Sequence, residues 1–141
     1  MSKHIVCSIC LATNSVPDNR LKDNPNCGKC HDDLFSKKAI EVDTKTFNKI
    51  TKKSTLPVIV DFWAPWCGPC KAMTPTYNQA AAQLIGEYIL IKINTEQEQQ
   101  LSGSLGIRSI PTLMAFKNGK EVNRMSGAMQ LSQLLQWIKS V

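Results

Sequence analysis

The six cysteines of this 141-residue chain form three pairs, each with the spacing C-x-x-C. The start of the chain lacks a signal-peptide pattern, so we expect a cytoplasmic protein whose thiols stay reduced. In that setting, cysteine pairs are typical of metal sites or redox catalysts. The residues around each pair therefore have to distinguish these two chemistries. The pairs are Cys7 and Cys10, Cys27 and Cys30, and Cys67 and Cys70.

Cys67 directly follows a continuous apolar run, residues 57–63, and precedes a segment with the pattern of a helix. An uninterrupted apolar run predicts a strand covered on both faces, so Cys67 would lie where a helix begins. The free N–H groups and the dipole of a helix N-terminus favour a negative charge there. They lower the pKa of a thiol below its usual value of about 8.5. We therefore predict that Cys67 is an exposed nucleophile.

Cys70 is the predicted partner of Cys67, because residues three apart share one face of a helix. Their Cα atoms would lie about 5 Å apart, which is within the range of a disulfide. Cys70 could then attack the mixed disulfide that Cys67 forms and release a reduced substrate. Pro69 costs nothing in the first helical turn, and Gly68 leaves backbone accessible to an incoming chain. A zinc half-site or two inert core cysteines are the disfavoured alternatives.

Three further features near this pair have two readings each. Asp61, inside the apolar strand, is either a buried proton acceptor for Cys70 or a carboxylate exposed at the strand end. Lys92, on the next expected strand, is either the partner of Asp61 or a surface lysine. Ile110-Pro111 precedes another expected strand. Pro111 is either an ordinary residue of an edge strand or a cis-proline whose turn leaves backbone groups free to pair with a substrate.

The four N-terminal cysteines have the spacing of a four-cysteine zinc site, two C-x-x-C turns separated by sixteen residues. Four thiolates close a tetrahedron without a position for water, so we expect one structural zinc ion. Tetrahedral sulfur also permits iron. The string "CGKCH" matches a haem-attachment pattern, but haem would leave the first cysteine pair without a role. His4 and His31 are expected bystanders. The predicted ligands are Cys7, Cys10, Cys27 and Cys30.

Residues 1–36 and 37–141 are predicted to be separate domains. The first part is rich in turns and has few large apolar residues, so it needs a metal or another cross-link to fold. The second part alternates strand and helix signals in the order βαβαβαββα. This order predicts an α/β fold with a mixed sheet covered by helices.

Local signals predict several element ends in the second domain. Asp43 is the expected N-cap of the first helix, and Thr95 with Glu98 is the expected capping box of the third. Asn118-Gly119 predicts a tight hairpin turn. The last helix carries an apolar stripe that should pack on the sheet. This stripe consists of Leu131, Leu134, Leu135 and Ile138.

The charge pattern and the length of the apolar runs disfavour two classes of partner. The net charge is +6, and the whole excess lies in residues 37–141. No basic cluster is interleaved with aromatic residues, so a nucleic-acid partner is not expected. No apolar run is long enough to cross a bilayer, so no membrane partner is expected. We expect a monomer.

Several strings resemble the thioredoxin family over residues 38–141: "VDFWAPWCGPC", "IPTL", "FKNG" and Gly127. With "CGKCHDDLF", the whole chain resembles the zinc-bearing thioredoxin 2 type of bacteria, although "HDD" departs from its usual glycine-histidine order. The resemblance implies a thioredoxin fold with a small N-terminal zinc ribbon-like module. It also implies a protein-disulfide reductase that acts on disulfide-containing proteins and is regenerated by an NADPH-dependent thioredoxin reductase.

The same resemblance implies roles for the residues around Cys67 and Cys70. Asp61 matches the buried proton acceptor of the family, and Pro111 matches its cis-proline. The implied redox-tuning residues are Gly68, Pro69 and Lys92. The expected substrate contacts are Trp66, Ile110 and Pro111.

The alternative function is a redox-regulated zinc-ribbon binding module on a thioredoxin scaffold.

Overall fold

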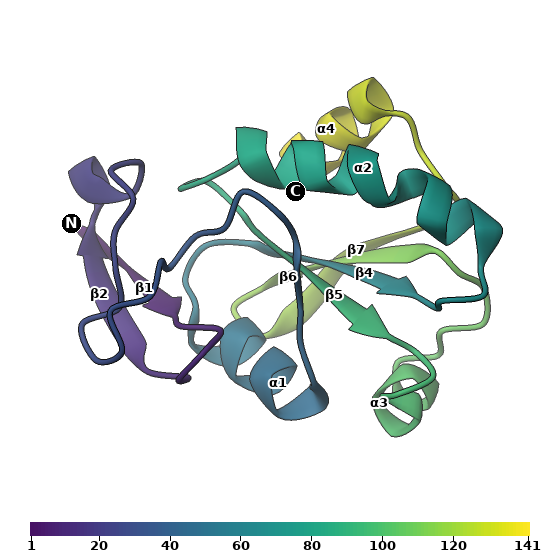
Figure 1. Ribbon diagram of the computed structural model, residues 1–141, viewed down its shortest axis with the longest axis horizontal. Helices are drawn as coiled ribbons and strands as arrows, with labels where there is room; N and C mark the ends of the chain where they lie inside the picture. Colours follow the sequence, from purple (N-terminus) through teal and green to yellow (C-terminus); the bar gives the residue numbers. More distant parts are fainter.

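The computed structural model describes residues 1–141 and contains a five-stranded sheet and a separate two-stranded sheet (Figure 1). None of its helices combines the length and the apolar character that crossing a membrane requires. The strands are β1 (Ser2–Val6), β2 (Thr13–Pro17), β3 (Ile40–Glu41), β4 (Val58–Trp63), β5 (Ile89–Asn94), β6 (Thr112–Lys117) and β7 (Lys120–Ser126). The α-helices are α1 (Thr44–Lys53), α2 (Gly68–Gln83), α3 (Gln99–Ser104) and α4 (Leu131–Lys139), and a 3-10 helix spans Asp18–Arg20.

The five-stranded sheet has the order β3-β5-β4-β6-β7. β5 pairs in parallel with both β3 and β4, whereas β6 pairs antiparallel with β4 and with β7. Helices α2 and α4 cover one face of this sheet, and α1 and α3 cover the other (Figure 1). The predicted mixed sheet and the predicted order of elements are confirmed.

β4 is the central strand, and its continuous apolar run reflects burial on both faces. Val60 and Phe62 face α1, where Phe62 packs edge-on against Phe47 with ring centroids 6.5 Å apart. Ile59 faces the opposite side and packs with Tyr77 of α2. Burial of large apolar side chains in two layers contributes most of the stability of such a core. This strand ends directly before the loop that carries Cys67.

Most of the predicted local signals act as expected. The Asp43 carboxylate accepts a hydrogen bond from the Thr46 N–H at 2.8 Å and so caps α1. Asn118 and Gly119 both have positive φ angles, 54° and 79°, as a two-residue hairpin turn requires. The predicted stripe of α4 packs on the face of the sheet that α2 shares.

The capping box that we predicted from Thr95 and Glu98 is wrong. α3 begins one turn later, and Glu98 itself is its N-cap residue, without a side-chain cap. The Glu98 carboxylate instead accepts hydrogen bonds from the N–H and hydroxyl of Thr44, at 2.8 and 2.9 Å. The Thr95 hydroxyl donates to the carbonyl of Trp63 at 3.1 Å. Partners brought close by the tertiary fold therefore replace the local pairing.

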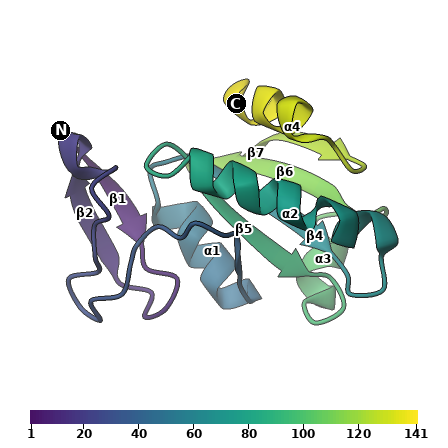
Figure 2. The same ribbon diagram turned by 45° about the horizontal axis from the view of Figure 1, so that its top comes forward.

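The N-terminal hairpin of β1 and β2 docks beside the loop between α1 and β4. The N–H of Thr55 donates to the His4 carbonyl at 3.0 Å, and the Thr55 hydroxyl accepts from the His4 N–H at 2.8 Å. An apolar cluster joins the two parts beneath these bonds: Ile5, Val16, Leu21 and Leu56. The hairpin lies at the end of the molecule opposite the start of α2 (Figure 2).

Candidate active site and metal centre

Cys67 and Cys70 form a disulfide at the start of α2, with their Cα atoms 5.3 Å apart. Cys67 is the N-cap residue, and its sulfur accepts a hydrogen bond from the Cys70 N–H at 3.2 Å. The predicted strand-to-helix junction and the predicted separation are both confirmed. The sulfur of Cys67 thus lies at the positive end of a 16-residue helix.

The expectation that Cys67 is exposed is wrong for the disulfide-bonded protein. Cys67 is 4% exposed and Cys70 is 1% exposed. Ile110 and Trp63 pack against the pair and help to remove the surface of Cys67 from solvent. The neighbouring residues Gly68 and Pro69 are exposed, so an incoming chain can still approach the backbone beside Cys67.

The peptide bond between Ile110 and Pro111 is cis, so the reading of Pro111 as an ordinary edge residue is excluded. The carbonyl oxygen of Ile110 lies 3.8 Å from the sulfur of Cys67. The carbonyl of Pro111 accepts a hydrogen bond from the Gly127 N–H at 2.9 Å. This geometry places a loop backbone beside the disulfide.

Asp61 is buried inside β4 and is not an exposed strand-end carboxylate. It is 4% exposed, and its Oδ1 atom has no hydrogen-bond partner. Burial raises the pKa of Asp61 to about 7, and the charge of Lys92 opposes that rise. Lys92 is the register partner of Asp61 on β5, and its ammonium group lies 4.9 Å from the centroid of the Trp63 ring. Because strand residues alternate, Asp61 faces α2, as Ile59 does.

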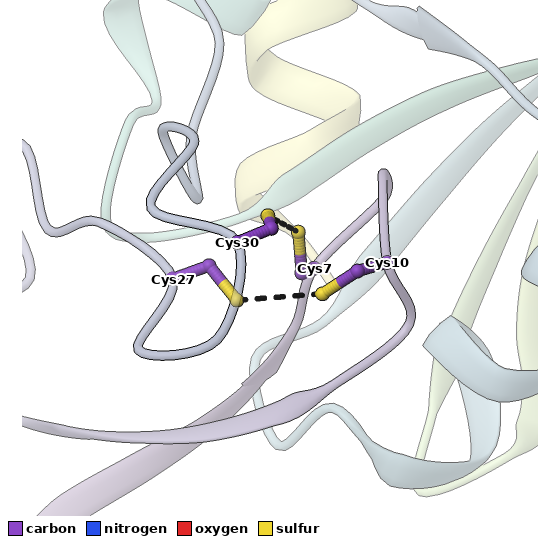
Figure 3. Close-up of side chains that lie close together, drawn as sticks. All are labelled: Cys7, Cys10, Cys27 and Cys30. Carbon is purple, nitrogen blue, oxygen red and sulfur yellow. Dashed lines mark hydrogen bonds between the residues drawn. The ribbon is translucent and has the colours of Figure 1, made fainter.

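The four N-terminal cysteines bring their sulfur atoms together (Figure 3). The sulfurs of Cys7 and Cys30 are 3.6 Å apart, and those of Cys10 and Cys27 are 3.5 Å apart. All four sulfurs lie within 4.8 Å of one another, and none is in a disulfide. Zinc–sulfur bonds of about 2.3 Å in a tetrahedron require sulfur separations of about 3.8 Å. The donor set therefore fits a tetrahedral metal site.

The two cysteine turns have the same backbone geometry. The N–H of Leu11 bonds to the Cys7 carbonyl, and the N–H of His31 bonds to the Cys27 carbonyl, both at 2.9 Å. Leu11 and His31 also share a left-handed backbone, with φ angles of 67° and 68°. Two equivalent turns facing each other supply two thiols each. His4 and His31 do not belong to this cluster.

Comparison with known proteins agrees with both parts of this geometry. Residues 38–140 match the family model described as thioredoxin. The chain belongs to the thioredoxin family. Residues 6–32 match the zinc-ribbon model described as thioredoxin 2, N-terminal, which contains the four clustered cysteines.

Individual thioredoxins are similar over most of the chain. Thioredoxin C-3 of Corynebacterium nephridii is 44% identical over 135 residues, which cover 95% of this chain and 92% of that protein. Thioredoxin 1 of a Nostoc species is 43% identical over 101 residues, covering 72% of this chain and 94% of that protein. A solved structure of a mutant thioredoxin from Halobacterium salinarum NRC-1 is 28% identical, with a TM-score of 0.68. The match covers 75% of this chain and 92% of the chain in that structure.

Family membership and the Cys67–Cys70 disulfide identify the chain as a thiol-disulfide oxidoreductase that reduces protein disulfides. The predicted thioredoxin fold with an N-terminal zinc ribbon is confirmed as well. These findings favour the reductase over the alternative of a binding module on a thioredoxin scaffold.

Glu96 is a residue of this thioredoxin site that the sequence did not indicate. Trp66, which is 67% exposed, donates its indole N–H to the Glu96 carboxylate. Glu96 lies in the turn after β5, where the Asn94 side chain accepts the Glu96 N–H at 2.9 Å. Thirty positions separate Trp66 from Glu96, and no spacing pattern links them. The contact fixes an aromatic side chain beside Cys67.

Asn14 is the corresponding missed residue at the metal centre. Its side-chain oxygen accepts the Gly28 N–H at 2.8 Å, and its amide nitrogen lies 3.5 Å from the sulfur of Cys27. Hydrogen bonds from the Cys30 N–H, the Asn14 amide and the Lys29 N–H lower the pKa of Cys27 to about 5. A thiolate is the form that binds a metal, so these bonds favour the ligand state. Asn14 lies on β2, away from either C-x-x-C string.

Proposed function

We propose that Cys67 is the nucleophile of this reductase. In the reduced protein, the Cys67 thiolate attacks one sulfur of a substrate disulfide, and the second substrate sulfur leaves as a thiolate. Its place at the N-terminus of α2 supports this assignment, because the Cys70 N–H and the helix dipole stabilise a negative charge on that sulfur.

Cys70 completes the exchange in our proposal. Its thiol passes a proton to the Asp61 carboxylate, and the resulting thiolate attacks the sulfur of Cys67. The Cys67–Cys70 disulfide forms, and the remaining substrate sulfur leaves as a thiolate. Two electrons thus pass from the cysteine pair to the substrate disulfide. Burial of Asp61 supports its role as the base, because a pKa of about 7 suits proton transfer near neutral pH.

Trp66, Ile110 and Pro111 are the proposed contacts for the substrate chain. The exposed Trp66 side chain and the backbone at Ile110 both lie beside Cys67, which supports this assignment. Gly68, Pro69 and Lys92 are the proposed redox-tuning residues.

A single structural zinc ion is proposed for the N-terminal cysteines, with Cys7, Cys10, Cys27 and Cys30 as its ligands. Bound zinc would supply a cross-link between the two turns and no reaction step, because four protein ligands leave no open position. Residues 1–36 are the proposed zinc module, and residues 37–141 the proposed thioredoxin domain.

The proposed partners are disulfide-containing proteins and a thioredoxin reductase that returns electrons to the pair. We propose a cytoplasmic monomer that takes part in thiol-based electron transport, without a nucleic-acid or membrane partner. The net charge of +6 is spread over several elements, which supports a solvated surface.

Insulin reduction with dithiothreitol as electron donor tests the mechanism. Cys67→Ser is expected to abolish catalysis, because the sulfur that lies at the N-terminus of α2 and attacks the substrate is removed. Prereduced Cys70→Ser, freed of dithiothreitol before insulin is added, is expected to accumulate a covalent complex between Cys67 and the substrate, visible by non-reducing mass spectrometry. Full turnover by Cys67→Ser would contradict the proposal. Metal analysis is expected to find one zinc per chain in the native protein and in both variants.

A further inference from the structure

Arg124 of the edge strand β7 reaches across to the C-terminal end of α3. Its Nη2 atom donates to the carbonyl of Leu105 at 2.8 Å, and its Nη1 atom donates to the carbonyl of Gly106 at 3.4 Å. The last carbonyls of a helix have no partners within the helix. A basic side chain that bonds to them fixes the helix end and the start of the loop beyond it.

Glu121 holds the Arg124 side chain in this direction. The Nε and Nη2 atoms of Arg124 donate to the two carboxylate oxygens of Glu121, at 2.7 and 3.0 Å. Arginine makes such paired bonds through a planar fork, and lysine has no equivalent. The guanidinium group therefore binds a carboxylate and two carbonyls at the same time.

The loop that starts at this clamp leads to the disulfide. Residues 106–110 lie outside helices and strands, and they end at Ile110, whose carbonyl lies 3.8 Å from the sulfur of Cys67. The far end of the loop is held near β6, where the Thr112 hydroxyl donates to the Ser109 carbonyl. Arg124 supplies side-chain hydrogen bonds at the near end. Arg124 thus adds to the backbone hydrogen bond from the Ile107 N–H to the Ser102 carbonyl, which also holds the near end of this exposed loop.

We propose that Arg124 is a positioning residue for protein substrates. By fixing the start of the loop, it holds the backbone at Ile110 where a substrate chain passes beside Cys67. This inference rests on the proposed function of Ile110. Loss of this positioning should affect two kinds of substrate differently. A protein substrate must pair with the loop backbone, whereas a small disulfide has to reach only the sulfur of Cys67.

The test compares Arg124→Gln with Lys120→Gln, a control that removes one positive charge from the same exposed strand. Lys120 takes part in neither of the ion pairs of the chain. Prereduced, zinc-loaded full-length protein is mixed with excess insulin or with 5,5′-dithiobis(2-nitrobenzoic acid), and oxidation is followed after acid quenching. For Arg124→Gln, the half-saturating insulin concentration is expected to rise about fivefold, at an unchanged maximum rate. Its rate with the small disulfide is expected to stay within about twofold of the native rate.

Two further variants separate positioning from general damage. Arg124→Lys keeps the charge without the fork and is expected to restore less than half of the loss with insulin. Glu121→Gln is expected to give a smaller loss of the same kind. Equal effects of Arg124→Gln and Lys120→Gln would overturn the inference, as would equal losses on insulin and the small disulfide. A native protein that reduces neither substrate would instead contradict the proposed function itself.

Discussion

Asp61 is the residue at which stability and chemistry conflict most directly. A carboxylate that is buried without a hydrogen-bond partner on Oδ1 costs free energy when it is charged. Burial raises its pKa to about 7, so near neutral pH both protonation states are populated. The same shift that destabilises the fold therefore prepares Asp61 to accept a proton.

We expect Asp61→Asn to be more stable than the native protein, and increasingly so as the pH rises. The unfolded carboxyl ionises from a pKa near 3.8, whereas the folded one ionises near 7. The stability of the native protein is therefore undiminished by Asp61 below the unfolded pKa. Stability is lost as the pH rises towards the folded pKa. The loss is about 2 kcal/mol at pH 5 and about 4 kcal/mol at pH 8. Urea unfolding of both oxidised proteins measures the difference, and a difference independent of pH would refute this account.

The same substitution is expected to slow the second half of the reaction. In the native protein, the attack of Cys70 should accelerate as the pH rises through about 7, because the carboxylate form of Asp61 is the base. Asp61→Asn should lose this pH inflection and react at least about tenfold more slowly at pH 7. Substrate release from a preformed mixed disulfide on Cys67, followed against pH, measures the step. An unchanged pH profile would exclude Asp61 as the base.

At the scale of elements, two helix N-termini of this chain direct a backbone N–H at a side-chain acceptor in the same manner. The Asp43 carboxylate accepts the Thr46 N–H at the start of α1, and the Cys67 sulfur accepts the Cys70 N–H at the start of α2. The hydrogen bond from the Thr46 N–H lowers the pKa of Asp43. One structural device thus stabilises a permanent anion in α1 and a reactive sulfur in α2.

Removal of the Asp43 cap should cost stability without affecting the reaction. We expect Asp43→Ala to lower the free energy of unfolding by about 1 kcal/mol, and Asp43→Asn to lower it far less because asparagine still caps. The pKa of Asp43 is lower in the folded protein than its unfolded value of 3.8. The stabilisation by its charged carboxylate is therefore present above pH 3.8 and is lost as the pH falls through the folded pKa. Denaturant unfolding of the three proteins checks this, and equal losses in both variants would contradict the cap.

At the scale of the whole molecule, the metal module and the redox site occupy opposite ends of the sheet (Figure 2). The module is joined to the thioredoxin domain through hydrogen bonds between His4 and Thr55 and through an apolar cluster around Ile5 and Leu56. A small hairpin on its own buries too little surface to be stable. The module therefore depends on both its cysteine cluster and its contact with the domain.

Two isoleucines of the module allow a matched test of this interface. Ile5 is 1% exposed and packs against the thioredoxin domain, whereas Ile9 is 64% exposed. Ile5→Ala is expected to lower the free energy of unfolding by about 3 kcal/mol, while Ile9→Ala should change it by less than about 0.5 kcal/mol. Both variants should reduce insulin at the native rate. Similar losses of stability in the two variants would show that the interface does not support the module.

The sequence by itself determined the features that depend on neighbours a few positions away. These include the apolar run of β4, the start of α2 at Cys67, the turn at Asn118-Gly119 and the two C-x-x-C turns of the module. Each follows from local spacing, because helix ends, tight turns and the apolar pattern of a strand depend on residues a few positions apart. For the same reason, the chemistry of both kinds of cysteine pair could be predicted.

Only the tertiary structure decided how distant segments meet. It placed Asp61 under α2, covered Cys67 with Ile110 and made the Ile110-Pro111 bond cis. It also formed the pairs of Trp66 with Glu96, of Glu98 with Thr44 and of Arg124 with the end of α3. The physical reason is that burial, and the competition for hydrogen-bond partners, depend on which elements pack together, and residue spacing along the chain carries no record of that packing.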